Sequence, residues 1–447
     1  MSKENSNLSI NKIKEYVNIP ATGVFLAYTM VQTLLFILWY IKEASFILRT
    51  MGAVSLLKES VLFLLIFGCV FLSFKNIIDL VVKNKIKLIY HIVLTLFITT
   101  SPLVVSMVVA STVFAVSIVF IMMLLYFCNR YFYGNHEKRL FHIIGVFALL
   151  FMLQIVNRAA FWCGEAVTFL FLSIQLIRNI ITKRKNIADK SWRNTLLLFC
   201  ILIIIVLIPQ YCNYNNIQHT LYHQSIREQL AARFIVPYVE AEKADGNYEY
   251  LLGVIEKDDY AYERSYNSFK EIIHRYEEDN LDMDEIWNNL YRNMYFRYFK
   301  SAVLRYVKDA SRNLFSAFLI KKEANSIELN SHHGYYYGLF QNASPKLSSI
   351  YMTFGVIGMC VIITAAFIQA IIICIIDLVT GKMKSRIASG NHAKIEAILL
   401  ILCAAITWNC FETLFSLEGT SYIIGTGTII LLSSLLPILF CRRTEAS

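Results

Sequence analysis

The chain has 447 residues, of which 57% are hydrophobic, and a formal net charge of +10. A soluble globular protein of this length would not be so apolar. The sequence carries no P-loop, no G-x-G-x-x-G motif and no recognised metal motif, which argues against an ATP-driven machine. Several runs approach the roughly 20 apolar residues that cross a bilayer core. We therefore expect an all-α, polytopic membrane protein.

Ten apolar runs predict about ten transmembrane helices. They cover roughly residues 20–42, 53–74, 88–105, 109–127, 140–156, 159–177, 195–213, 348–376, 395–414 and 421–441. They divide the chain into an N-terminal membrane domain over 1–213, a polar segment over 214–346, and a C-terminal membrane domain over 347–447. The polar N-terminus shows neither the apolar core nor the cleavage site of a signal peptide, so the first run is expected to be a retained anchor.

Lysine and arginine set the predicted orientation, because they are enriched in cytoplasmic loops. With ten spans, every strongly basic short loop falls on one side, which is then cytoplasmic together with both termini. The polar segment 214–346 falls outside. It holds 16 basic and 19 acidic residues, so the positive excess belongs to the membrane domains and predicts no nucleic-acid partner. Abundant Ile, Lys and Asn suggest an AT-rich bacterial genome, and hence the plasma (inner) membrane of a bacterium.

The segment 214–346 has a helical pattern and is rich in tyrosine and phenylalanine. Asp282 stands three residues before Glu285, the spacing of a capping box. Apolar residues then recur at helical intervals, at Ile286, Leu290, Met294, Phe299, Val303 and Val307. A second helix is expected over 263–279. The sequence predicts a helical extracytoplasmic domain whose aromatic side chains either stack on sugar rings or pack the domain onto the bilayer interface.

Two pairs of histidines are candidate ligands. His219 and His223 have the i, i+4 spacing of two metal ligands on one helix face, but no third ligand is evident nearby, so no metal site is assigned to them. His332 and His333 precede a glycine and three tyrosines, just before the eighth span. His333 is a candidate substrate contact, and the alternative is a solvated loop histidine.

Charged residues recur near the outer ends of the spans, although a charge in the membrane zone is costly. They are Glu43, Arg49, Lys58, Glu59, Arg158, Glu165, Glu412 and Glu418. Either they line one outward-opening cavity or they reach water separately. Arg158 lies in "IVNRAAFW", between two spans, where we expect a tight, wet hairpin tip with few core contacts. Its planar guanidinium suits a phosphate, and Glu165 lies two helical turns further on the same face.

Two stretches resemble the GT-C superfamily of membrane glycosyltransferases, and more closely its bacterial members related to protein mannosyltransferases. The stretch 100–127, "TSPLVVSMVVASTVFAVSIVFIMMLLYF", resembles the family's small-residue–proline turn, short outer helix and polar residue opening the next long span. The stretch 148–172, "ALLFMLQIVNRAAFWCGEAVTFLFL", resembles a later span pair in which an arginine marks the outer turn. The stretch 291–319 and the following Ser344–Pro345 are similar to the family's outer segment re-entering the membrane.

The resemblance implies inverting transfer of one sugar from a polyprenyl-phosphate donor to a cell-envelope glycan, lipid or protein acceptor at the outer face. The transfer would use either a divalent metal ion or a carboxylic acid alone. Glu43 matches the first-loop acidic residue that activates the acceptor, and the alternative is a solvated carboxylate beside Lys42. Arg158 would bind the leaving phosphate, with Arg49, Glu59, Glu165 and His333 as further substrate contacts. The family's second acidic residue is expected near Thr112, where this sequence has no carboxylate.

Three other functions are also compatible with the sequence. An O-antigen-type polymerase or ligase also has many spans and one large outer loop, and "HHGYYYGLF" followed by Gly355 and Gly358 is faintly similar to its loop-end pattern. A lipid or polysaccharide transporter usually shows internal repeats and helices broken by glycine or proline at matching places, and none is evident here. A catalytically inactive envelope scaffold would fit the missing second carboxylate.

Overall fold

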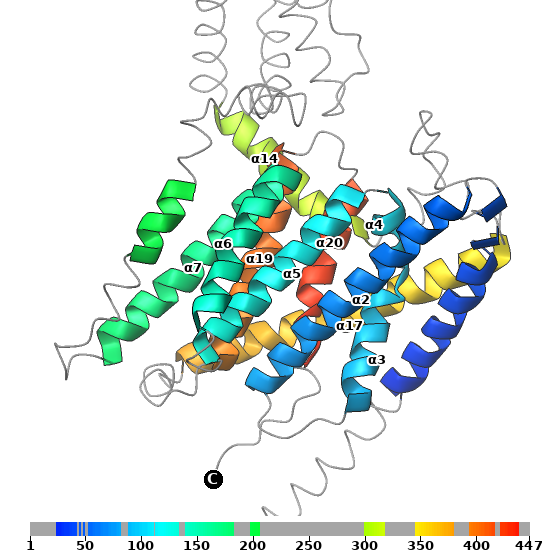
Figure 1. Ribbon diagram of the computed structural model, residues 1–447, viewed down its shortest axis with the longest axis horizontal. Coiled ribbons are helices and arrows are strands. Elements are labelled where there is room, and N and C mark those ends of the chain that lie inside the picture. The colour runs from blue at the N-terminus through cyan, green and yellow to red at the C-terminus, as the bar shows by residue number, and fades with distance from the viewer. Residues whose placement is uncertain are drawn as a thin grey trace, which may run out of the picture. The chain divides into compact units, whose positions relative to one another are not determined.

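A computed structural model gives the fold of the chain. It describes residues 24–42, 44–45, 48–49, 52–81, 88–110, 112–133, 139–182, 197–205, 299–317, 345–379, 393–415 and 421–437. These residues are almost entirely helical, and no strand occurs among them (Figure 1). The prediction of an all-α protein is confirmed for this part of the chain.

The helices follow the apolar runs of the sequence. They are Val24–Lys42, α2 (Ala53–Val81), α3 (Leu88–Thr99), α4 (Pro102–Ala110), α5 (Thr112–Tyr133), α6 (Arg139–Val156), α7 (Arg158–Thr182), a short helix over 197–205, α14 (Phe299–Ser316), α17 (Pro345–Val379), α19 (Ala393–Phe415) and α20 (Ser421–Ser433). Helix α14 confirms part of the helix that the sequence predicts in the polar segment. The second helix predicted there, over 263–279, lies outside the described residues.

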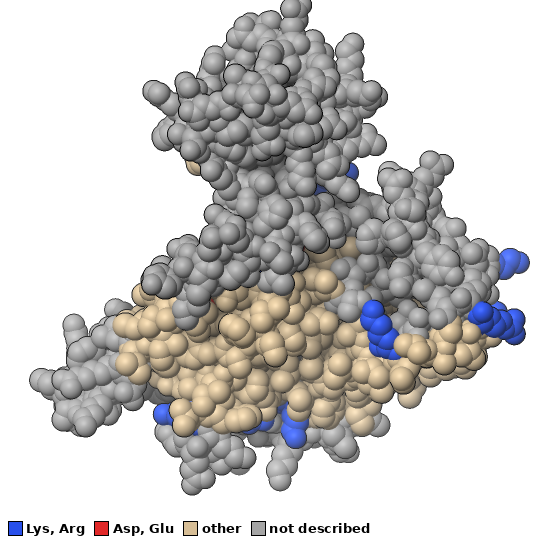
Figure 2. Space-filling model, turned by 45° about the horizontal axis from the view of Figure 1, so that its top comes forward, with Lys and Arg blue, Asp and Glu red and all other residues tan. Residues whose placement is uncertain are grey.

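Six of the described helices are long and apolar enough to cross a membrane. They contain the spans Val24–Lys42, Val113–Tyr131, Arg139–Val156, Arg158–Ile177, Ser349–Ile376 and Ile395–Phe415. Large apolar side chains stand exposed on these helices, among them Met30 and Ile357. The described surface in Figure 2 is mostly uncharged, with lysine and arginine at its margins. An apolar surface of this kind is stable against the hydrocarbon of a bilayer. The helices therefore indicate a multi-pass membrane protein.

The region predicted as spans 88–105 and 109–127 is divided differently. Helix α3 ends at Thr99, and the separate nine-residue helix α4 begins at Pro102. Proline disfavours the helical conformation in the residue before it and suits the first position of a new helix. Ser101 caps α4, because its Oγ accepts a hydrogen bond from the Val104 amide at 3.3 Å. Residues 100–133 therefore form a turn, the short helix α4 and a long helix that begins at Thr112.

The described helices belong to two compact units. The first takes residues 1–149, 317–405 and 429–447, and the second takes 150–316 and 406–428. In the first unit, α2 packs against both α3 and α5, and α4 contacts α5 and α17. The second unit contains the end of α6, then α7, α14, the last part of α19 and most of α20.

A polar network ties three elements of the first unit together. Gln32 Nε2 donates to the Phe97 carbonyl at 2.8 Å and to Thr100 Oγ1 at 3.2 Å. The Tyr351 hydroxyl donates to the Thr100 carbonyl. The polar atoms of Phe97 and Thr100 at the end of α3 thus form hydrogen bonds to the helix Val24–Lys42 and to α17. Such bonds allow a helix to break inside apolar surroundings.

Candidate functional site

The turn between α6 and α7 is built around Asn157, which belongs to neither helix. Its Oδ1 accepts hydrogen bonds from the amides of Ala159 at 2.9 Å and Ala160 at 3.2 Å. These are the second and third residues of α7, so Asn157 is the N-cap of that helix. Its own amide donates to the Leu153 carbonyl at 2.8 Å, which continues the hydrogen bonding of α6. One asparagine thus closes α6 and opens α7 with no intervening loop.

The same asparagine bonds to a carboxyl group far along the chain. Asn157 Nδ2 donates to Glu412 Oε1 at 2.8 Å. Glu412 lies in the last turn of α19 and is 1% exposed. The hydrogen bond therefore links the α6–α7 turn to the end of a third helix within the second unit.

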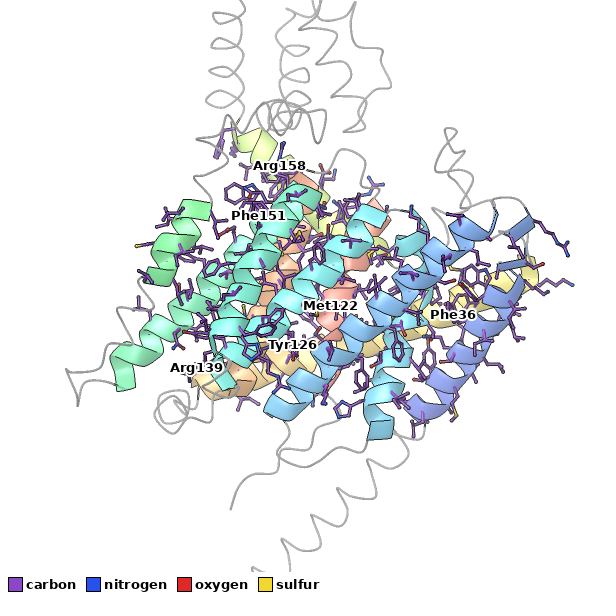
Figure 3. All side chains as sticks on the ribbon, viewed as in Figure 1. Phe36, Met122, Tyr126, Arg139, Phe151 and Arg158 are labelled. Atoms are coloured by element: carbon purple, nitrogen blue, oxygen red, sulfur yellow. The ribbon has the colours of Figure 1, made fainter. Side chains whose placement is uncertain are left out.

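Arg158 is the first residue of α7, at the end of α6 opposite Arg139 (Figure 3). Its side chain is only 3% exposed, so the expectation of a wet hairpin tip with few core contacts is wrong. The error arises because the turn is not a free loop. Asn157, also buried, holds the turn against α19 through Glu412.

The helix dipole of α7 acts in opposite ways on the buried side chains of Glu412 and Arg158. The N-terminus of a helix carries a partial positive charge and favours a nearby anion. Glu412 reaches the N-terminus of α7 through Asn157, so its position is favourable for a carboxylate. Arg158 is a cation at that same N-terminus, where its own helix repels it. A helix N-terminus joined by a guanidinium is well suited to an anionic group such as phosphate.

Glu165 lies two turns further along α7 and is 6% exposed. Its Oε1 is buried and accepts no hydrogen bond from the described residues. The i, i+7 spacing places it on the same face of α7 as Arg158, as the sequence predicts. A buried carboxyl oxygen without a donor is costly, so Glu165 remains a candidate substrate contact.

Helix α14 packs along the end of α19 through a series of hydrogen bonds. The Tyr306 hydroxyl donates to the Cys410 carbonyl at 2.9 Å, and Asn409 Nδ2 donates to the Ala310 carbonyl at 2.9 Å. Asn313 Nδ2 donates to Thr413 Oγ1, also at 2.9 Å. These contacts place α14 on the part of α19 that carries Glu412. We call the hydrogen-bonded pair Asn157 and Glu412, with Arg158 next to Asn157 in the chain, the α7–α19 cluster.

The other predicted site residues lie in the first unit or outside the described residues. Arg49 is exposed and belongs to the first unit. Glu59 lies in α2, and the placement of its side chain is not described. Glu43 and His333 lie outside the described residues, as do His219, His223, His332 and Glu418. The predicted meeting of Glu43 with Arg158 in one cavity therefore stays a prediction.

A divalent metal ion would require a set of suitable ligands. No group of three or more His, Cys, Asp or Glu side chains in the described ranges could hold one. The α7–α19 cluster pairs its carboxyl group with an amide, not with further metal-binding side chains. The described residues therefore do not fit a metal ion, and the chemistry below uses none.

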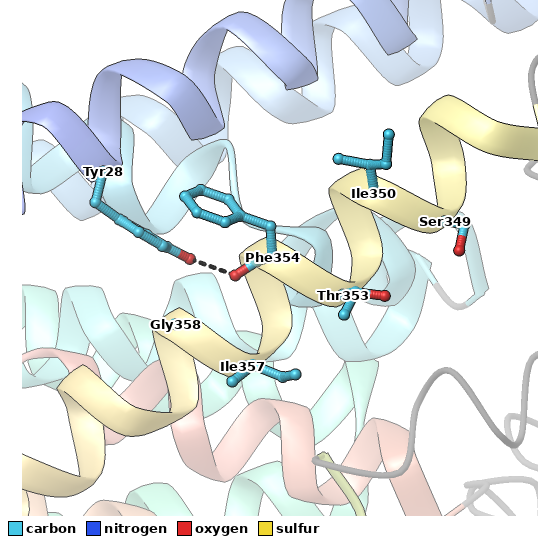
Figure 4. A pocket seen from close by; sticks show the side chains of 7 residues that line it. All are labelled: Tyr28, Ser349, Ile350, Thr353, Phe354, Ile357 and Gly358. Carbon is cyan, nitrogen blue, oxygen red and sulfur yellow. Dashed lines mark hydrogen bonds between the residues drawn. The ribbon is translucent and has the colours of Figure 1, made fainter.

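The first unit contains an apolar cavity of about 610 Å³ between the helix Val24–Lys42 and α17 (Figure 4). It is lined by Tyr28, Ser349, Ile350, Thr353, Phe354, Ile357 and Gly358. The Tyr28 hydroxyl donates to the Phe354 carbonyl at 2.8 Å, and the two rings stack with centroids 4.5 Å apart. Its described lining holds hydroxyl groups but no carboxylate, imidazole or amine side chain.

Close packing accounts for the two glycines that follow the tyrosine-rich stretch. A Cβ at Gly355 would lie 2.5 Å from the Pro102 ring, and a Cβ at Gly358 would overlap the Tyr28 ring. Small residues of this kind let membrane helices approach closely. The glycine pair thus has a structural role in α17.

Sequence reasoning did single out Arg158 and Glu165, but it missed the roles of Asn157 and Glu412. Asparagine directly before an apolar helical run is an N-cap signal, so the capping of α7 could have been predicted. The bond to Glu412 could not, because it joins residues 255 positions apart. Comparisons of the chain with protein-family models, with curated proteins and with solved structures find no match.

Proposed function

We propose that this protein is an integral membrane glycosyltransferase. It would move a sugar from a polyprenyl-phosphate donor to a cell-envelope glycan, lipid or protein acceptor at the outer face of a bacterial plasma membrane. The observation that carries the proposal is the burial of Arg158 at the N-terminus of α7, next to the Asn157–Glu412 hydrogen bond. An ionisable residue inside a membrane domain is costly and is by default a candidate functional site, and a guanidinium suits a phosphate.

The proposed topology has ten spans, both termini in the cytoplasm and residues 214–346 outside. Six helices that could cross a membrane support it, together with the clustering of basic residues in alternate loops. In this orientation the α6–α7 turn lies at the outer face. A lipid-linked sugar presents its phosphate at that depth, within reach of a residue at the end of a span.

The position of the α7–α19 cluster also favours a transferase over a transporter. Transporter substrate sites usually lie near the bilayer midplane, at broken helices. Asn157, Arg158 and Glu412 lie instead at the ends of α6, α7 and α19. Chemistry on a membrane-anchored phosphate takes place at the headgroup level, which the ends of spans occupy.

The reaction requires an acceptor hydroxyl to attack the anomeric carbon while the bond from that carbon to the phosphate oxygen breaks. A carboxylate takes the hydroxyl proton. Glu43 remains the proposed base, and Glu412 becomes a second candidate because it lies beside the Arg158 turn. The guanidinium of Arg158 would stabilise the charge that develops on the leaving polyprenyl phosphate. Arg49, Glu59, Glu165 and His333 remain proposed substrate contacts.

The test is a reaction with purified full-length protein in vesicles. The donor is a monosaccharide linked to polyprenyl phosphate, and the acceptor is an envelope extract. Release of polyprenyl phosphate together with transfer of labelled sugar is the expected result. Sugar transfer from a soluble nucleotide sugar alone, in vesicles free of lipid-linked sugar, would contradict the proposal.

A further inference from the structure

Helix α14 has one side fixed to α19 and two others that face outward. The fixed side carries Tyr306, Ala310 and Asn313, whose hydrogen bonds to α19 are given above. The residues bonded on α19 lie in the last two turns of the candidate span Ile395–Phe415. Helix α14 therefore lies at one end of a span, at the depth where a bilayer has its headgroups.

The outward surface of α14 consists of two neighbouring rows with four-residue spacing. The first row is mainly apolar and contains Phe299, Val303, Val307, Ser311 and Phe315. The second row is mainly basic and contains Lys300, Leu304, Lys308 and Arg312. Every one of these side chains is exposed, with Phe315 at 63% and Leu304 at 62%.

Neither water nor a protein core suits both rows. Exposing four large apolar side chains to water forfeits hydrophobic free energy in proportion to their area. Burying three cations in a protein interior would require three anionic partners. An interface between hydrocarbon and charged headgroups satisfies both rows, and helices of this pattern bind in the plane of a membrane.

We propose that α14 lies in the headgroup region of the bilayer and binds anionic phospholipids. Its apolar row inserts at the acyl boundary, while Lys300, Lys308 and Arg312 contact lipid phosphates. The helix has 18 residues and spans about 27 Å, enough to contact several lipids. This surface is independent of the glycosyltransferase proposal, since it requires no substrate and no reaction.

The test uses a photoreactive amino acid in place of Leu304 in the full chain. The protein is placed in vesicles with equal amounts of phosphatidylglycerol and phosphatidylcholine, irradiated, and analysed for adducts by mass spectrometry. We expect phospholipid adducts enriched in phosphatidylglycerol. The matched control has the same amino acid at Leu64, which is 70% exposed on the apolar helix α2, and should give lipid adducts without enrichment.

The combined change Lys308→Gln and Arg312→Gln tests the basic row directly. Each basic side chain near a membrane surface contributes about 1 kcal/mol to anionic lipid binding, or about fivefold. The double variant should therefore lower the anionic-to-neutral adduct ratio at Leu304 at least fivefold, with an unchanged gel-filtration profile. Adducts to this chain or to another protein in place of lipid would overturn the proposal. The proposal would also be overturned if the anionic-to-neutral adduct ratio equalled the lipid composition of the vesicles, or if the double variant left that ratio unchanged.

Discussion

Replacing Asn157 should separate its two roles at the α6–α7 turn. The change Asn157→Ala removes the cap of α7 and the bond to Glu412 together. Loss of an N-cap costs about 1 kcal/mol. A hydrogen bond between membrane helices contributes about 0.6–1.7 kcal/mol. The free energy of unfolding should therefore fall by about 1.5–3 kcal/mol. The change Asn157→Ser keeps a capping oxygen but is too short to reach Glu412, so it should lose only about 0.6–1.7 kcal/mol.

The measurement is reversible unfolding in mixed micelles with increasing sodium dodecyl sulfate, followed by circular dichroism. Glu412→Gln retains an oxygen that can accept from Asn157, so it should change the free energy of unfolding by less than about 1 kcal/mol. Ser173→Ala is the control on α7, because the half-buried Ser173 donates its hydroxyl to the Phe169 carbonyl within the same helix. Equal losses in Asn157→Ser and Asn157→Ala would refute the capping role. Stability in Asn157→Ala equal to that of Ser173→Ala would refute both roles.

Two further predictions concern packing and topology. Gly358→Ala should lower the free energy of unfolding by about 1–3 kcal/mol because its new Cβ would overlap the Tyr28 ring. Gly68→Ala is the control and should change the free energy of unfolding little, because a Cβ there meets nothing within 4 Å. Equal losses in the two variants would refute the close approach of α17 to Tyr28. In a chain stripped of native cysteines, a cysteine at position 247 should react with an impermeant maleimide in intact cells while a cysteine at 185 should not. The reverse labelling pattern would contradict the outward placement of residues 214–346.

The helices of the membrane domains were largely predictable, because long apolar runs can satisfy their backbone hydrogen bonds in a bilayer only by forming helices. The break at Ser101–Pro102 was also visible in the sequence, although it shortens the predicted third span to α3. Helix α14 follows the helical spacing of Phe299, Val303 and Val307. Those residues are exposed, however, and the opposite side of α14 bonds to α19.

The candidate site was less predictable, because its geometry depends on a contact between distant parts of the chain. Arg158 stood out as a charge between two apolar runs. Arg158 is buried beside the hydrogen bond from Asn157 to Glu412, and nothing in the local sequence indicates that bond. Gly355 and Gly358 stood out in the sequence for their spacing, and the structure shows that both are packed closely in α17. Residue type indicated which side chains were unusual, and tertiary contacts decided what surrounds them.

Polyprenyl-phosphate release by Arg158 variants tests the proposed glycosyltransferase most directly. Arg158→Ala should slow release by the equivalent of about 2–4 kcal/mol, because the leaving phosphate loses its cation in a dry site. Arg158→Lys keeps the charge but not the planar fork, so it should retain part of the rate. Because Arg158 is buried, rates must be compared at equal amounts of protein that elutes as a folded species. Lys75→Ala serves as the control, because Lys75 is exposed, and this variant should release polyprenyl phosphate at the wild-type rate. A wild-type rate in Arg158→Ala would contradict the account.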